Sequence, residues 1–208
     1  MIPFTPVFIV VSTTSHVYIE QHIPVTVVPY NATTSTVTIP DVPFYSQFKD
    51  ITSSSWQKVG CGVTSLAMVI EYYKPETVSV NTLLNQGITL GAYQQKNGWS
   101  HQGLISLSKK YGLDGNSHDV SKLSRKAALS QFKGYLDDGP VIVSIHYKFD
   151  PKSTVPHLVV INGIKDGIVY YNDPAAKVGE KTITEDKFLN GWKRKFIVVR
   201  PAWQISLT

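Results

Sequence analysis

The chain of 208 residues contains a single cysteine, Cys61. One cysteine cannot form an intramolecular disulfide, and it excludes metal sites built on paired cysteines, although it does not exclude an oxidising compartment. A chain of this length can bury a substantial core without such a cross-link. A lone cysteine is most often a small buried apolar residue, so its role depends on where it lies.

Long apolar runs are missing as well. No stretch approaches the roughly 18 apolar residues that mark a membrane span, so we expect no transmembrane segment. The start of the chain, Met1 to Val11, lacks the basic region and the small-residue cleavage site of a signal peptide. These features fit a cytosolic protein, or the mature part of a longer precursor with Met1 added at its start.

Acidic residues are fewer than basic ones, 15 against 20, which gives a net charge of +5 and a pI of about 9.1. The basic residues are scattered, and only Lys193 to Lys195 form a run. A nucleic-acid site needs basic residues clustered on one face, so we expect no nucleic-acid partner. The mild positive charge suits an anionic surface, and we expect a secreted or cell-envelope associated protein, with a cytoplasmic location left open.

Residues 1–40 differ in composition from the rest of the chain. They are rich in Val, Thr and Ile and alternate between Val17 and Val28 and again from Thr33 to Ile39, a pattern typical of strands. We therefore predict a small β-rich extension over 1–40, followed by one domain over 41–208.

The segment that begins at Cys61 predicts a buried helix. It ends at Lys74-Pro75, because a residue before proline is disfavoured in the α region. A thiol at a helix N-terminus feels the positive end of the helix dipole, which favours the nucleophilic thiolate. Gly60 and Gly62 flank it, and their missing side chains would let a substrate backbone approach. Apolar residues recur at spacings of three and four: Val63, Leu66, Ala67, Ile70 and Tyr73.

The rest of the domain places helices before strands, which indicates an α+β fold and not a doubly wound one. Helices are predicted over Thr82 to Gln86 (broken at Gly87), His101 to Tyr111, Arg125 to Leu136 and, as a short turn, Glu185 to Gly191. Strands are predicted over Val141 to Tyr147, Leu158 to Ile164, Ile168 to Asn172, Lys181 to Thr184 and Phe196 to Arg200.

A thiol nucleophile needs a base and a group that orients the base, and six histidines compete for the first role. His157 is the best placed, because it lies at the start of an apolar strand, where a side chain reaches a cleft from a rigid element. The other histidines have ordinary structural or solvent-exposed roles as the simpler interpretation. His16 and His22 lie in the β-rich extension, His118 lies in a polar loop, and His146 follows a strand. His101 lies at a helix start, where the helix dipole lowers its pKa and makes it a poorer base.

Asp173 is the matching carboxylate, since it closes the strand that pairs with the strand of His157. A strict two-residue turn at Asp166-Gly167 would point the two side chains to opposite faces of the sheet. We therefore predict a three-residue connection or an equivalent bulge, with Gly167 in the left-handed conformation. Upstream, the loop after Gln47 leads to Cys61, and a glutamine side chain can donate an N–H to a developing oxyanion.

Taken together, these segments resemble the bacteriocin-leader (double-glycine) processing peptidases and their stand-alone, papain-like relatives over about residues 41 to 200. The similar segments are Val42 to Gln47, Gly60 to Met68, Gly98 to Leu104, Lys110 to Leu113, Pro156 to Val160 and Tyr171 to Pro174. The resemblance implies a papain-like fold in which a helical half, with the Cys-bearing helix at its centre, packs on an antiparallel sheet.

The resemblance also implies roles for individual residues. Cys61 would be the nucleophile, His157 the general base and later acid, Asp173 the residue that orients the imidazole, and Gln47 an oxyanion donor. No cofactor or metal is implied. We expect the substrate, a peptide or protein, to contact the neighbouring residues Gly60, Trp99, His101 and Pro156. The chain departs from the family at Val63, where relatives often carry proline or glutamate, and it contains no transporter domain.

Two other functions stay open at this point. The same scaffold could hydrolyse or transfer non-peptide amides and acyl groups. It could also be a catalytically silent domain that holds a peptide or a cell-wall component, although an intact set of Cys, His, Asp and Gln argues against this.

Overall fold

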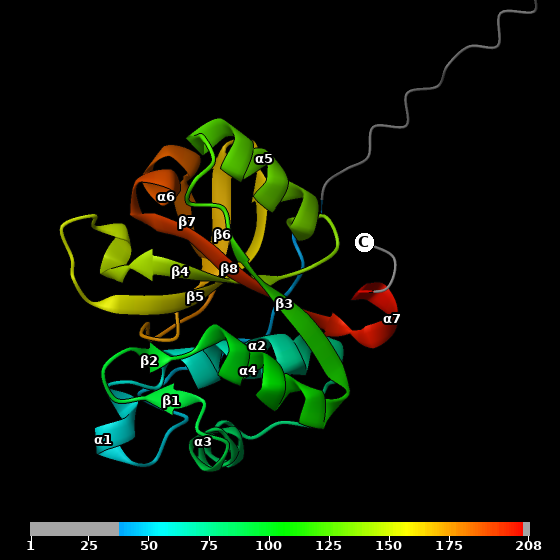
Figure 1. Cartoon of the computed structure of the whole chain (residues 1–208), viewed down its shortest axis with the longest axis vertical. Coiled ribbons are helices and arrows are strands. Elements are labelled where there is room, and N and C mark those ends of the chain that lie inside the picture. The colour runs from blue at the N-terminus through cyan, green and yellow to red at the C-terminus, as the bar shows by residue number, and fades with distance from the viewer. Residues whose placement is uncertain (1–37, 206–208) are drawn as a thin grey trace, which may run out of the picture. The chain divides into compact units, whose positions relative to one another are not determined.

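The computed structural model describes residues 38–205. The predicted β-rich extension over 1–40, with His16 and His22, therefore lies outside the described residues except for its last three positions. At the centre of the described part is a six-stranded antiparallel sheet with the strand order β3-β8-β4-β5-β6-β7. Helices cover both faces of this sheet (Figure 1).

The predicted strands are confirmed, with ends that differ by a few residues. One further strand joins the six-stranded sheet: β3 forms where the sequence suggested a polar loop around His118. It pairs only with β8, at the edge of the sheet, so much of it can stay polar and exposed. The strands are β3 (Leu113–Asp119), β4 (Val141–His146), β5 (Pro156–Lys165), β6 (Ile168–Asn172), β7 (Lys181–Thr184) and β8 (Trp192–Pro201), and a separate pair comprises β1 (Tyr93–Gln94) and β2 (Gly98–Trp99).

The helix predictions are also confirmed, with two differences. The helix predicted over His101 to Tyr111 is α-helical only to Ser108 and ends in the 3-10 turn η1. The helix predicted over Thr82 to Gln86 is longer and continues through Gly87, where a side chain would collide with Trp99 and Leu107. Gly87 is thus kept for close packing and does not break the helix. The helices are α1 (Ser54–Gln57), α2 (Cys61–Tyr73), α3 (Val80–Thr89), α4 (His101–Ser108), η1 (Lys109–Tyr111), α5 (Arg125–Leu136), η2 (Tyr147–Phe149), α6 (Glu185–Gly191) and α7 (Ala202–Ile205).

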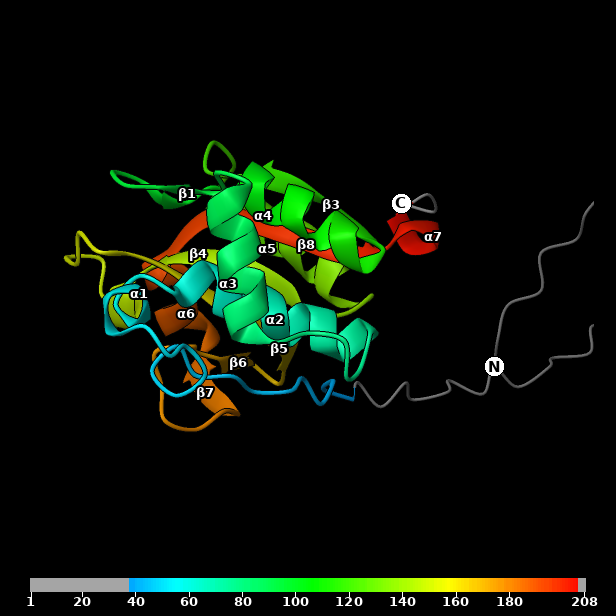
Figure 2. The ribbon, with the colours of Figure 1, turned by 90° about the horizontal axis from the view of Figure 1, so that it is seen from below.

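The sheet separates two apolar clusters. Leu158 and Val160 of β5 face α2, α3 and α4, whereas Val159 and Ile161 of the same strand face α5 and α6, as the alternation of side chains along a strand requires. Figure 2 views this arrangement from the side of α2, α3 and α4. The α+β class, and the packing of the Cys-bearing helix on an antiparallel sheet, are both confirmed.

Within residues 38–205, no helix combines the length and the apolar character needed to cross a membrane.

Candidate active site

Cys61 is the first residue of α2, after the N-cap residue Gly60. Its side chain is partly exposed and lines a cleft of about 780 Å³. An α-helix leaves its first N–H groups without partners inside the helix, and at α2 these include the N–H of Cys61 itself. The thiol therefore lines the cleft at a helix N-terminus, where backbone N–H groups lack partners within the helix.

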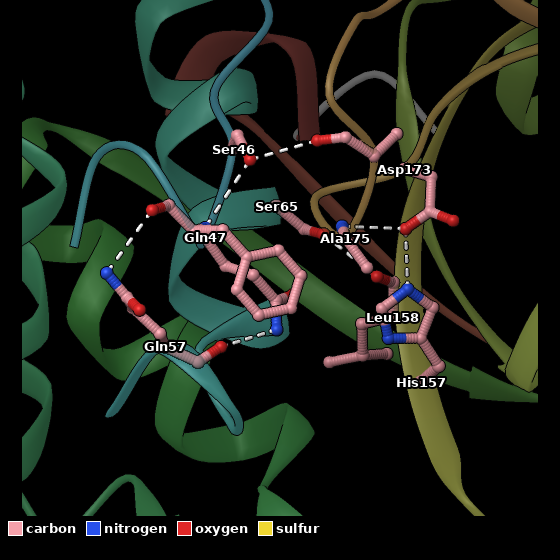
Figure 3. A network of polar contacts seen from close by, with 10 residues as sticks. Ser46, Gln47, Gln57, Ser65, His157, Leu158, Asp173 and Ala175 are labelled. Atoms are coloured by element: carbon pink, nitrogen blue, oxygen red, sulfur yellow. Dashed lines mark hydrogen bonds and ion pairs between the residues drawn. The ribbon is translucent and has the colours of Figure 1, made fainter. Parts of the chain in front are cut away.

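His157 and Asp173 form the second part of the site. Nε2 of His157 lies 2.7 Å from Oδ1 of Asp173, and the same oxygen accepts a hydrogen bond of 2.8 Å from the N–H of Ala175 (Figure 3). An ionised carboxylate can only accept, so Nε2 carries the proton in this pair. The other ring nitrogen, Nδ1, is left for Cys61, which lines the same cleft and helps to raise the pKa of His157.

A bulge places the two side chains on the same face. Lys165 pairs with Ile168 across the two-residue turn, in which Asp166 and Gly167 have φ of 51° and 74°. The register then shifts by one between Ile161 and Gly163. The predicted bulge and the left-handed Gly167 are confirmed, and the extra residue of the bulge is Asn162.

The charges in this group support one another. Burial by itself would lower the pKa of His157, but the hydrogen bond with Asp173 and the interactions with the side chains of Asp173 and Cys61 raise this pKa to about 9. Burial would raise the pKa of Asp173, whereas His157, the N–H of Ala175 and Lys181 lower it below its usual range. These interactions therefore favour a charged imidazolium at His157 beside an ionised Asp173.

Ser65 connects the two halves of the site. It lies one helical turn after Cys61 and hence on the same side of α2. Its Oγ donates a hydrogen bond of 3.2 Å to the carbonyl of Leu158, the residue after His157 (Figure 3). This buried bond holds α2, which carries the thiol, in place against β5, which carries the imidazole. The sequence analysis missed this role, because the partner of Ser65 lies 93 residues away in the chain.

Gln47 lines the same cleft and is almost fully buried. Its N–H donates to the carbonyl of Pro174, directly after Asp173, at 2.8 Å. Its Nε2 donates to the carbonyl of Gln57 at 2.6 Å, which uses one of the two amide hydrogens (Figure 3). The loop of Gln47 is thus attached to the loop of Asp173, and the second amide hydrogen has no partner among the described residues.

The residues expected to contact substrate lie in different environments. Trp99 and Pro156 line the cleft, but the Trp99 ring is buried and its N–H donates to the carbonyl of Val59 at 2.7 Å. His101 also lines the cleft, and its Nδ1 and Nε2 each lie 2.8 Å from a serine hydroxyl, of Ser117 and Ser144. The pKa of His101 is lowered, mainly by burial and also by Lys195.

The two glycines beside the thiol have a packing role. Gly60 is not among the residues that line the cleft, and a side chain at this position would collide with Ile51. A side chain at Gly62 would collide with the ring of Trp99. The space that the sequence analysis assigned to a substrate backbone is therefore filled by the protein itself.

The remaining described histidines, His118 and His146, have other partners than the thiol. His118, expected to be solvated, is half-buried and stacks on Phe196 with a centroid distance of 4.7 Å. His146 contacts the carbonyl of Ser153 through Nδ1 at 2.9 Å. Within the described part of the chain, neither histidine forms a hydrogen bond with Cys61.

A helix N-terminal thiol, an imidazole and a carboxylate on an antiparallel sheet define the class of papain-like cysteine hydrolases. A sequence model of the family described as "Peptidase_C39 like family" matches residues 39–196. The chain belongs to this family and is a cysteine-type peptidase.

Solved structures show the same fold. The peptidase of an AMS/PCAT transporter, a double glycine motif protease in complex with its leader peptide, is 22% identical with a TM-score of 0.55, covering 80% of this chain and 96% of that one. A C39-like peptidase from Bacillus anthracis is 22% identical with a TM-score of 0.57, covering 76% and 93%. The peptidase domain of Streptococcus ComA, an ABC transporter of a quorum-sensing pathway, is 21% identical with a TM-score of 0.53, covering 69% and 93%. No curated protein sequence matches the chain.

Proposed function

We propose that Cys61, His157 and Asp173 are the catalytic triad of this peptidase and that Gln47 donates to the oxyanion. The observation that carries this proposal is the setting of His157: its Nε2 pairs with Asp173, and it lines the same cleft as Cys61, which helps to raise its pKa. A base held between a nucleophile and an orienting carboxylate is the arrangement that nucleophilic catalysis requires.

The first half of the reaction forms an acyl-enzyme. The Cys61 thiolate attacks the carbonyl carbon of the scissile peptide bond, and the carbonyl oxygen becomes an oxyanion. This oxyanion accepts hydrogen bonds from the Cys61 N–H and from the free hydrogen of Gln47 Nε2. The C–N bond then breaks, the imidazolium of His157 gives its Nδ1 proton to the leaving amine, and a thioester remains on Cys61.

The second half returns the enzyme to its starting state. A water molecule attacks the thioester carbonyl, and His157, now neutral, accepts a proton from that water. The C–S bond breaks, the new carboxyl product leaves, and the thiolate of Cys61 again faces an imidazolium. Asp173 stays ionised throughout and stabilises the charged ring.

We further propose a peptide as the substrate in this cleft. Phe48 and Val155 line the cleft and remain 50% and 55% exposed, although both are apolar. Exposed apolar side chains at a cleft can contact the side chains of a peptide on either side of its scissile bond. A small amide substrate has no such side chains and would not need these contacts. The transporter peptidase of this fold that was solved with a leader peptide supports a peptide as the occupant.

We also propose, from the net charge of +5, that the protein works outside the cytoplasm at an anionic cell envelope. Fractionation of the native host cells, with detection of the protein in the wall and medium fractions, tests this location. Recovery in the cytoplasmic fraction alone would contradict it.

Two measurements test the triad together. The first is alkylation by iodoacetamide at about pH 6, where an ordinary thiol reacts slowly because its pKa is about 8.5. We expect rapid labelling of the native protein, slow labelling of His157→Ala, and none of Cys61→Ala, since the chain has no other cysteine.

The second measurement is cleavage of a peptide library made by digesting a proteome with chymotrypsin, followed by mass spectrometry. New termini should appear with the native protein and not with Cys61→Ala. Equal cleavage by Cys61→Ala or His157→Ala would overturn the triad. Incorporation of an added amine in place of water would instead assign an acyl transferase to the same residues.

A further inference from the structure

Positive side chains dominate the cleft outside the reacting residues. Among the residues that line it, four are lysines and only Asp119 carries a carboxylate; the lysines are Lys58, Lys96, Lys193 and Lys195. Two of these lysines lie on the helical side of the cleft, after α1 and in the β1–β2 turn, and two belong to β8. A ligand in the cleft therefore has positive charge on both sides.

Only one of these lysines is paired. Nζ of Lys195 lies 3.1 Å from Oδ2 of Asp119, and both side chains are about half exposed. In the part of the chain that the structure describes, Lys58, Lys96 and Lys193 form no ion pair. The cleft thus keeps a surplus of positive charge after its single carboxylate has been satisfied.

The strand register shows where this charge lies relative to the reacting residues. Leu158 pairs with Ser144, Ser144 with Lys195, and Lys195 with Asp119, so the four form one row across β5, β4, β8 and β3. All four line the cleft. Neighbouring strands lie about 4.8 Å apart, which puts the backbone of Lys195 about 10 Å from that of Leu158, next to His157.

The floor of this part of the cleft is polar. His101 lies between the hydroxyl groups of Ser117 and Ser144, and Ser144 is the member of the row between Leu158 and Lys195. The charge of Lys195 is felt there, since it helps to lower the pKa of His101. This part of the site therefore offers hydroxyl groups and ammonium groups to a ligand.

We propose that this lysine-rich part of the cleft binds acidic side chains of the peptide substrate, two to four residues from the scissile bond. The spacing follows from the distance of about 10 Å, because an extended peptide advances about 3.3 Å per residue. The inference rests on the proposed peptidase function and adds the substrate class: peptides with Asp or Glu near the cleaved bond.

The test starts from the peptide library described above. The termini produced by the native protein should be enriched in Asp and Glu at two to four positions on one side of the cut. The best-cleaved peptide is then made with Glu and with Gln at that position. Both versions are amidated, so that a terminal carboxylate cannot occupy the lysines. We expect kcat/KM to favour the Glu peptide by about threefold to tenfold in low salt.

Salt and substitutions identify the source of this preference. The ratio of kcat/KM for the Glu peptide to that for the Gln peptide should fall in high salt, because salt screens the attraction between charges near the surface. Lys193→Gln and Lys195→Gln should each lower the ratio by at least about twofold. Lys126→Gln is the matched control: it removes the same charge from exposed residue Lys126 of α5, which does not line the cleft, and should leave the ratio unchanged.

The outcomes separate the two proposals. Efficient cleavage with a Glu-to-Gln ratio near one overturns the acidic-substrate inference and leaves the peptidase proposal standing. A ratio that Lys126→Gln lowers as much as Lys193→Gln also overturns it, because the effect would then come from net charge alone. Failure of the native protein to cleave any peptide overturns both.

Discussion

Nε2 of His157 and Oδ1 of Asp173 lie 2.7 Å apart because one extra residue, Asn162, interrupts the pairing of the strands that carry them. Without that bulge the tight turn at Asp166-Gly167 would continue its register, and the two side chains would point to opposite faces. The base and its orienting carboxylate thus depend on a local irregularity several residues away from both.

The pH dependence of cleavage should follow the protonation of His157. Burial opposes its charge, but Asp173 and Cys61 raise its pKa to about 9. The imidazolium supplies the proton of the leaving amine, so kcat/KM should hold up to about pH 9 and then fall as pH rises further. Steady-state cleavage of one peptide across the alkaline range measures this limb.

Asp173→Asn isolates the effect of the carboxylate charge on this limb. The amide oxygen can still accept from Nε2–H, so the ring keeps its orientation while the charge is lost. Without the carboxylate charge, burial lowers the pKa of His157. The alkaline limb of the pH profile should therefore move to lower pH. A limb that stays near pH 9 in Asp173→Asn would show that the carboxylate does not set this pKa.

Replacing Gln47 by methionine should lower kcat and leave KM nearly unchanged. Methionine fills a similar volume but has no N–H for the oxyanion, which forms only after attack. Loss of one such donor typically costs on the order of 10² to 10³ in kcat. Gln57→Met is the control, since the Gln57 side chain supports the same loop through the carbonyls of Phe48 and Ile51. If kcat falls as far in Gln57→Met as in Gln47→Met, the loss comes from a disturbed loop and not from a missing oxyanion donor.

Ser65→Ala should reduce both stability and activity. The change leaves the carbonyl of Leu158 buried without its partner, which typically costs about 1–3 kcal/mol of unfolding free energy. Ser108→Ala is a matched control, because the buried Ser108 hydroxyl donates to the carbonyl of Ile105 within its own helix. Urea unfolding should show a loss for both variants, whereas kcat/KM should fall only for Ser65→Ala. Native kcat/KM in Ser65→Ala would rule out the alignment role.

Gly62→Ala should destabilise the protein, because the added carbon would lie 2.5 Å from atoms of the Trp99 side chain. Overpacking of this kind typically costs about 1–3 kcal/mol. Gly134→Ala, in the last turn of α5 with open space around it, should instead stabilise by up to about 0.5–1 kcal/mol, since alanine is the better helix former. Thermal unfolding compares the two, and equal shifts of Tm would mean that Trp99 can move aside.

The elements that a short segment defines by itself were predictable. Helix α2 over Cys61–Tyr73 and helix α5 over Arg125–Leu136 have the predicted bounds, because apolar spacing, capping residues and a following proline all act within one segment. The edge strand β3 was not predicted, since its polar residues show no alternation and it is held in place by pairing with β8.

The same division applies to the site. The order and the local context of Gln47, Cys61, His157 and Asp173 singled out these residues, and a one-residue register argument predicted the bulge. The packing of Trp99 against Gly62, the bond from Ser65 to Leu158 and the row that brings Lys195 into the cleft were decided by tertiary structure. They join residues far apart in the chain, and no local period of helix or strand carries information about such distant partners.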